Sequence, residues 1–205
     1  MSSSNLIRWS GLAAVIASVL LLIPDISAIY QPGEFSERVT TGTHAFESLL
    51  RMIAFVLLLP LGLVGLYARQ SEAAGPLGLL GFLVAFAGTV LVAGFVWTDT
   101  FIAPELATSA PQLLETGPPP GRSLSFLVFG IGWVLFGVAS LLAHVYPPRA
   151  AILLIIGAVL ATVLFLTLIA VPFGGLVFQI AVAWLGLVLF TGWGASGSEQ
   201  PSRVS

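Results

Sequence analysis

The chain has 205 residues, of which 58% are hydrophobic and only 8% are charged. Soluble domains are about one quarter charged, so this chain has too few polar side chains to cover a water-soluble globule. It contains no cysteine and no lysine, and its net charge is −2. These counts exclude disulfides, thiolate metal ligands and lysine or thiol nucleophiles, and they argue against nucleic acid as a partner. The chain is predicted to be a membrane protein with the lipid bilayer as its main surroundings.

Long apolar segments define the predicted fold. A helix needs about 20 mostly apolar residues to cross a hydrocarbon core of about 30 Å. Six segments meet this requirement, at residues 6–23, 49–67, 77–97, 124–145, 151–171 and 176–193. We therefore expect an all-α bundle of six transmembrane helices that forms a single domain over residues 1–205. The first segment is expected to be retained, because its apolar run is longer than that of a cleaved signal peptide.

The last two predicted spans need a turn between them. Residues 150–198 carry no charge, and one helix over residues 150–193 would be about 66 Å long, more than twice the core thickness. Residues 172–175, with the sequence Pro-Phe-Gly-Gly, are the expected turn. Proline cannot continue a helix past its first turn, and glycine has few backbone restrictions.

Arginine positions predict the orientation, because positive charge is retained on the cytoplasmic side. If the N-terminus is inside, the inner segments carry a net charge of +2 and the outer segments −4. The inner charges are Arg8, Arg69, Arg149 and Arg203 against Glu72 and Glu199. The outer charges are Arg38, Arg51 and Arg122 against Asp25, Glu34, Glu37, Glu47, Asp99, Glu105 and Glu115. Both termini are therefore predicted to be cytoplasmic, in a multi-pass protein of the cell inner (plasma) membrane.

Two long outer loops are predicted, at residues 24–48 and 98–123. In the second, Pro104 and Pro111 each mark the expected first turn of a short helix, where the missing N–H is not needed. This loop is interpreted as a stiff connector on the membrane surface, or alternatively as a lid over a cavity between the helices. Within the second span, Pro60 is expected to kink the helix, because it frees the carbonyl of Val56.

Small residues four positions apart mark the expected helix contacts, since lipid gives no hydrophobic drive for helix association. Such pairs are Ala85 with Thr89, Gly94 with Thr98, and Gly157 with Ala161. They are interpreted as intramolecular contacts, with a seam between two copies as the alternative.

The best candidate site lies at the start of the second span. Thr43 is expected to cap the helix, after which His44, Glu47 and Arg51, together with Ser48, recur at three- and four-residue spacing and share one face. Asp25 and Asp99 end the first and third spans, so they are expected at the same depth as this face. One interpretation is a salt-bridge network that fastens three helices. The other is an acidic outer vestibule for a proton, a cation or a cationic solute.

Two further candidates lie within the spans. Gln179 is expected to hydrogen-bond to another helix, with ligand binding as the alternative, and Trp133 is noted as an intramembrane polar residue. His44 and His144 fall on opposite faces of the membrane, so they are not expected to share a metal or a haem. No metal site, cofactor or catalytic residue is predicted.

These patterns predict a non-catalytic function. The first hypothesis is an accessory or scaffold component of a membrane assembly, whose partner is another membrane protein or a second copy of the chain. The alternative is a small transporter or channel for a cation, a proton or a small solute that uses the acidic outer vestibule.

Overall fold

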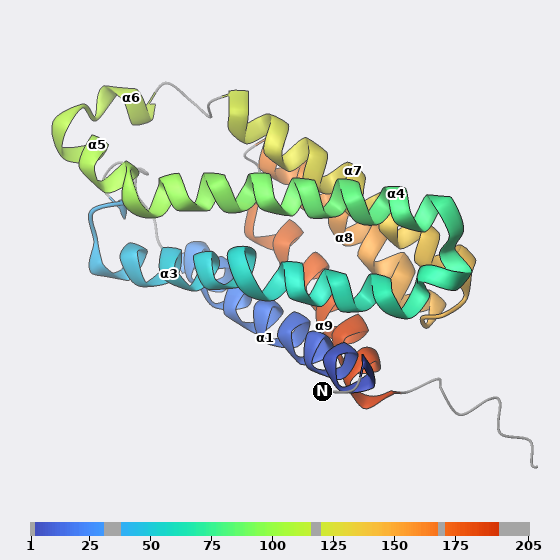
Figure 1. Ribbon diagram of the computed structural model, residues 1–205. Helices are drawn as coiled ribbons and strands as arrows, with labels where there is room; N and C mark the ends of the chain where they lie inside the picture. The colour runs from blue at the N-terminus through green and yellow to red at the C-terminus, as the bar shows by residue number, and fades with distance from the viewer. Residues whose placement is uncertain (1–2, 31–37, 116–119, 168–170, 193–205) are drawn as a thin grey trace, which may run out of the picture.

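The computed structural model describes residues 3–30, 38–115, 120–167 and 171–192, and every regular element among them is helical (Figure 1). These elements are α1 (Ser3–Tyr30), α3 (Gly42–Ile53), the π-helix η1 (Ala54–Leu58), α4 (Leu59–Phe101), α5 (Ala103–Ser109), α6 (Gln112–Glu115), α7 (Pro120–Ala143), α8 (Pro148–Thr167) and α9 (Val171–Thr191). Among the described residues, four helical stretches are long and apolar enough to cross a membrane: Asn5–Tyr30, Gly42–Phe101, Pro120–Ala143 and Phe173–Thr191. The prediction of an all-helical chain with membrane-spanning helices is confirmed at this level.

The stretch Gly42–Phe101 reverses direction at Gly75. This residue has φ 55° and ψ −155°, a left-handed φ that glycine adopts without the steric cost of a Cβ. The chain folds back there (Figure 1), so that the ring of Tyr67 stacks on that of Phe82 with 4.5 Å between centroids. The two arms contain the predicted spans 49–67 and 77–97. We call the end of the bundle with this reversal the Gly75 end, and the opposite end, which carries α5 and α6, the α5 end.

The expected distortion near Pro60 takes the form of a π-helical turn. η1 occupies Ala54–Leu58, and the N–H of Leu59 donates to the carbonyl of Ala54, five residues earlier. Because Pro60 has no N–H to donate to Val56, the helix widens by one residue just before it.

The helices pack through close glycine contacts. The second arm of α4 packs on α7, α1 packs on α9, and α8 lies between α7 and α9. A Cβ on Gly132 would collide with the backbone of Ala85, and one on Gly157 with the backbone of Phe178. Both contacts lie within one chain, and Ala85 and Gly157 belong to the predicted small-residue pairs. Gly94 has nothing near its Cβ position, so the structure shows no contact there.

Aromatic side chains fill the centre of the bundle. Trp133 and Phe136 are fully buried, and the ring of Trp133 lies 5.0 Å from that of Phe178. At the Gly75 end, the buried hydroxyl of Tyr146 donates to the carbonyl of Leu66 at 2.8 Å. Burial raises the pKa of the Tyr146 phenol well above its ordinary value, although nearby Arg69 opposes this, so the hydroxyl remains a donor.

The predicted turn at residues 172–175 is wrong. α8 ends at Thr167 and α9 begins at Val171, so Pro172 lies in the first turn of α9 and both glycines are inside the helix. Proline is well tolerated in the first turn of a helix, because the N–H groups there have no acceptor within the helix. Gly174 instead packs against the backbone of Ala161, which explains the absence of a side chain there.

Several predicted boundaries also move. α1 continues past Pro24 to Tyr30 and α3 begins at Gly42, so much of the predicted outer loop 24–48 is helical. A proline is tolerated inside a membrane helix when neighbouring groups satisfy the freed backbone. In the predicted loop 98–123, α4 extends to Phe101, and α5 begins at Ala103 with Pro104 in its first turn, as expected. α6 begins at Gln112, directly after Pro111.

Candidate functional site

The N-terminus of α3 sets the candidate site at the α5 end. Thr41 is the N-cap, with an extended backbone (φ −82°, ψ 149°) and a hydroxyl that accepts from the N–H of His44 at 3.2 Å. The predicted cap, Thr43, is wrong: α3 begins at Gly42, so Thr43 lies inside the first turn and Thr41 caps the helix. From this start, the face with His44, Glu47 and Ser48 turns into the bundle and is buried.

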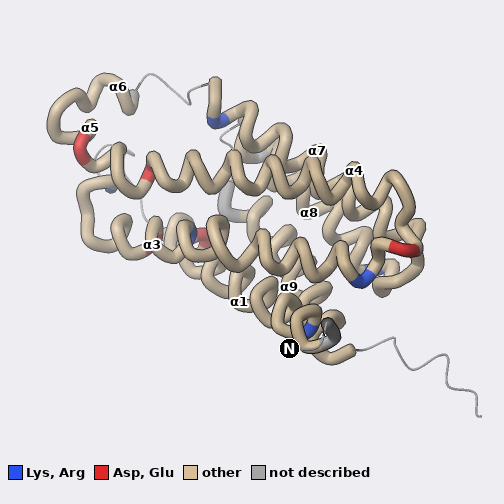
Figure 2. The backbone as a smooth tube through the Cα atoms, in the orientation of Figure 1, with Lys and Arg blue, Asp and Glu red and all other residues tan. Residues whose placement is uncertain are grey.

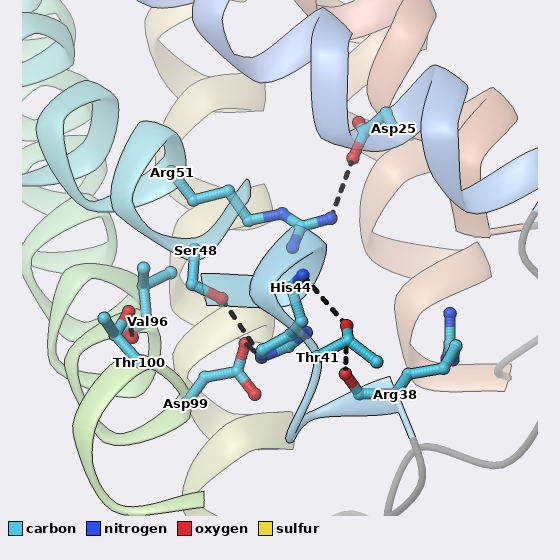
Figure 3. Close-up of polar contacts among 9 residues, drawn as sticks. All are labelled: Asp25, Arg38, Thr41, His44, Ser48, Arg51, Val96, Asp99 and Thr100. Carbon is cyan, nitrogen blue, oxygen red and sulfur yellow. Dashed lines mark hydrogen bonds and ion pairs between the residues drawn. The ribbon is translucent and has the colours of Figure 1, made fainter. Parts of the chain in front are cut away.

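His44 connects α3 to the end of α4. Its Nε2 atom lies 3.1 Å from Ser48 Oγ and 3.8 Å from Asp99 Oδ2 (Figure 3). The expected depth match between His44 and Asp99 is therefore present in the structure. The pair is a full ion pair only when the imidazole is protonated.

Asp25 connects α1 to α3 and α9. Its Oδ1 lies 4.0 Å from Arg51 Nη2 (Figure 3), and its Oδ2 accepts from Gln179 Nε2 at 2.7 Å. Glu47 is close enough to act on the same carboxylate electrostatically. A Cβ on Gly175 would collide with Asp25 Oδ2, so α9 approaches this carboxylate closely because a glycine is at that position.

Gln179 was predicted to lie apart from the outer polar residues, whereas in the structure it contacts Asp25 of that group. The depth of the two residues along their predicted spans could have indicated this contact. Gln179 is near the start of its span and Asp25 is near the end of the first span, so antiparallel helices bring both to the same end. The side-chain oxygen of Gln179 is buried and accepts no hydrogen bond from the described residues.

Trp133, the other intramembrane candidate, is not part of this cluster. Its indole Nε1 donates to Thr89 Oγ1 at 3.2 Å, and the residue is fully buried among aromatic rings. Its role in the structure is to pack α7 against α4.

Two further arginines belong to the α5 end. Arg38 and Arg122 both act electrostatically on Asp99, as do His44 and Arg51. The guanidinium carbon of Arg122 lies 5.2 Å from the ring centroid of Phe95 and 5.6 Å from that of Phe165. Arg38 and Arg122 were not among the predicted site residues, because nothing in their spacing links them to the polar face of α3.

The geometry of Ser48, His44 and Asp99 does not match a catalytic triad. In a triad, serine and aspartate bind different ring nitrogens, whereas here both approach Nε2 of His44. Ser48 is also fully buried, so its hydroxyl is inaccessible to a substrate. Within the described part of the chain, no three His, Asp or Glu side chains are grouped to hold a metal ion. The arrangement is suited to joining helices and to binding charged groups.

Comparisons with protein families, with curated proteins and with solved structures find no match to this chain. Function must therefore be argued from the charges and contacts of the site itself.

Proposed function

We propose that the chain crosses the plasma membrane six times, with both termini in the cytoplasm. The four long apolar stretches and the shorter apolar helix Pro148–Val163 support this, because Gly42–Phe101 supplies two antiparallel arms. The arginine count supports the cytoplasmic location of the termini, because four arginines fall on the predicted inner side and three on the outer side. Most of the acidic residues in Figure 2 lie at the α5 end of the molecule, where α5 and α6 also lie, whereas Glu72 lies near the reversal at Gly75.

The absence of native cysteine gives a direct test of this topology. Single cysteines would replace Ala73 near the reversal, Thr108 on α5 and Arg149 at the start of α8. We expect a membrane-impermeant maleimide to label position 108 on intact cells, and positions 73 and 149 only after permeabilisation. Labelling of all three on intact cells, or of position 108 only after permeabilisation, would contradict the orientation.

We further propose that the protein is a non-catalytic scaffold or accessory component of a membrane assembly. The observation that carries this proposal is the mutual pairing of polar groups at the α5 end. Asp25 is held by Gln179 and Arg51, and His44 is held by Ser48 and Asp99. Pairs that join α1, α3, α4 and α9 favour a fixed arrangement of helices over an open path for a solute.

A photo-crosslinking residue tests the scaffold proposal in cells. Ile23 lies on the exposed face of α1, at 44% exposure, whereas Ala17 on the same helix is fully buried. We expect the probe at position 23 to give one defined protein adduct, either with a partner or with a second copy, and the probe at position 17 to give none. Equal adducts from both positions, or only lipid adducts from position 23, would contradict the proposal.

The second candidate is a small transporter for a proton, a cation or a small solute. The buried, unsatisfied oxygen of Gln179 beside Asp25 favours it, as does the π-helical turn that begins three residues after Arg51. π-helical turns occur frequently at functional sites.

Liposomes that contain a pH-sensitive dye test this candidate. If the chain carries protons or cations through Asp25, purified wild-type protein should relax an imposed gradient, and Asp25→Asn should not. Arg149→Gln is the matched control, because Arg149 is exposed at the Gly75 end. Wild-type liposomes that behave like empty ones would contradict transport and leave the scaffold proposal unaffected.

A further inference from the structure

A buried hydrogen-bond acceptor lies beside the carboxylate of Asp25. Gln179 is 4% exposed, and its Nε2 donates to Asp25 Oδ2 at 2.7 Å. The oxygen of the same amide, Oε1, is buried and accepts no hydrogen bond from any residue that the structure describes. Because Nε2 and Oε1 are bonded to one carbon, the 2.7 Å bond holds this acceptor next to the carboxylate. A buried polar atom without a partner is unfavourable, so the amide lacks one donor.

Asp25 can supply this donor only in its protonated form. A carboxylate only accepts hydrogen bonds, whereas a carboxylic acid has one O–H donor and keeps an acceptor oxygen. A carboxylic acid and a primary amide are therefore complementary. While Asp25 is ionised, the amide can satisfy only its Nε2 side, because turning it over would place Oε1 of Gln179 against a negative charge. A proton on Asp25 completes the hydrogen bonds of the pair.

The surroundings of Asp25 allow a proton to bind. Its side chain is 18% exposed, so the carboxylate is not sealed inside the bundle. The predicted outer segments carry a net charge of −4, which favours a cation at this end of the molecule. Gln179 Oε1 needs no access of its own, because the donor comes from a side chain that already contacts the amide.

Two charged groups of α3 act on the Asp25 carboxylate. Arg51 Nη2 lies 4.0 Å from Asp25 Oδ1 (Figure 3), beyond hydrogen-bonding distance, and it stabilises the ionised form. Glu47 acts on the same carboxylate and opposes the ionised form. α9 contains no charged residue, so it contacts Asp25 through an uncharged amide.

We infer that Asp25 and Gln179 form a proton-binding site where α1 meets α9. An O–H bond forms between a proton from water and a carboxylate oxygen of Asp25, and this O–H donates to Gln179 Oε1. The carboxylate loses its negative charge in this step, so its attraction to Arg51 is lost too. Arg51 then has Glu47 one turn earlier on the same face of α3. Proton binding thus replaces a contact between α1 and α3 by a second hydrogen bond between α1 and α9.

Infrared difference spectra of the purified full chain test proton binding directly. A protonated carboxyl group has a carbonyl stretching band that a carboxylate lacks, and the amide band of the same spectrum shows whether the helices remain folded. The pH is lowered from about 8 to about 4, close to the ordinary titration range of aspartate. We expect wild-type protein to gain one carboxyl band that Asp25→Asn does not gain. Asparagine resembles the protonated acid, because its amide offers Gln179 both a donor and an acceptor.

Two further variants test the partner and the neighbour of Asp25. Gln179→Met has no amide, so the Asp25 band should move to the higher frequency of a carboxyl group without hydrogen bonds. In Arg51→Gln, half-protonation should occur at a proton concentration about tenfold lower or less, because a nearby opposite charge is lost. Arg149→Gln is the matched control, because Arg149 is exposed at the Gly75 end, and it should change this concentration by less than about twofold.

The absence of an Asp25-dependent band from folded protein at about pH 4 would overturn the inference. A band of unchanged frequency in folded Gln179→Met would also overturn it, because Gln179 would then not be the partner of the acid. If Gln179→Met does not fold, the frequency of the wild-type band decides, because only a hydrogen-bonded carboxyl group absorbs at the lower frequency.

As the assignment of a substrate, the inference rests on the transporter candidate and names the proton, whereas the binding site itself does not require transport. The two can therefore fail separately. An Asp25 band in a protein that gives no flux in liposomes would support the site and exclude transport. Flux without the band would leave another cation as the transported solute and overturn the inference.

Discussion

Replacing Thr89 with valine tests whether a single interhelical hydrogen bond stabilises the α4–α7 contact. Thr89 Oγ1 accepts from Trp133 Nε1 at 3.2 Å and donates to the carbonyl of Ala85 at 2.7 Å. Both Thr89 and Trp133 are fully buried, so no water can replace the lost acceptor. Valine has the same shape and branching as threonine, so the substitution removes the hydroxyl with little change in packing or helix propensity.

The expected magnitude follows from the surroundings of the bond. A buried donor left unsatisfied costs about 1–3 kcal/mol in soluble proteins, whereas interhelical bonds in membrane proteins average about 0.6 kcal/mol with a maximum near 1.7. We expect Thr89→Val to lower the free energy of unfolding by about 1 kcal/mol, near the middle of the second range. Thr89→Ser keeps the hydroxyl and serves as the matched control.

The assay is unfolding of the purified protein in mixed micelles with increasing sodium dodecyl sulfate, followed by far-ultraviolet circular dichroism. Trp133→Phe completes a double-mutant cycle, because phenylalanine keeps an aromatic ring but has no N–H. The coupling free energy between positions 89 and 133 should be about 0.6–1.7 kcal/mol. A Thr89→Val effect of the same size in the Trp133→Phe background would refute the reasoning, since the cost would then not depend on the indole donor.

Three further predictions concern close helix contacts at glycine, a left-handed backbone conformation and an ion pair. Gly132→Val should destabilise the bundle by about 1–3 kcal/mol in the same assay, because its Cβ would collide with the helix backbone opposite, whereas Gly94→Ala, in open space, should stabilise it by about 0.5–1 kcal/mol. His144 has φ 54°, a left-handed conformation that costs a residue with a side chain about 1 kcal/mol. His144→Gly should therefore raise the unfolding midpoint. A lower midpoint would show that the contact of the His144 ring with the Leu142 carbonyl outweighs the strain. Arg51→Ala should reduce the yield and midpoint of detergent-purified protein, because Asp25 loses its charge partner, and unchanged stability with lost ligand binding would show a binding role instead.

The sequence predicts the local features of this fold well. Runs of apolar residues identify the helical segments. The two short helices begin at Ala103 and Gln112, each next to a proline, because proline suits the start of a helix. The three- and four-residue spacing of His44, Glu47 and Arg51 places them on one face, as a helix requires. In each case the information lies within about two helical turns of the residue concerned.

The features that the sequence analysis missed depend on the environment of the helix. A Pro-Phe-Gly-Gly segment is compatible with a turn or with a helix start, and here it starts α9, in which Gly174 and Gly175 closely approach Ala161 and Asp25. The contacts of Gln179 with Asp25 and of His44 with Asp99 join residues that are far apart in the chain. The depth of a residue in the membrane limits which residues on other helices it can contact. Which of these contacts forms depends on which helices pack side by side.

The contacts between α1 and α9 bear directly on the choice between scaffold and transporter. Near the Gly75 end, Gly11 and Gly186 meet backbone to backbone, and Arg8 binds the last turn of α9. Near the α5 end, the carboxylate of Asp25 lies against Gly175 and accepts from Gln179. A sliding or rocking motion of α1 over α9 would have to break both sets of contacts, because each allows one register only. A transport cycle in this protein would therefore leave these two helices as one unit and move the arm formed by α3 and η1, whose Arg51 lies 4.0 Å from Asp25 and whose Glu47 acts on the same carboxylate.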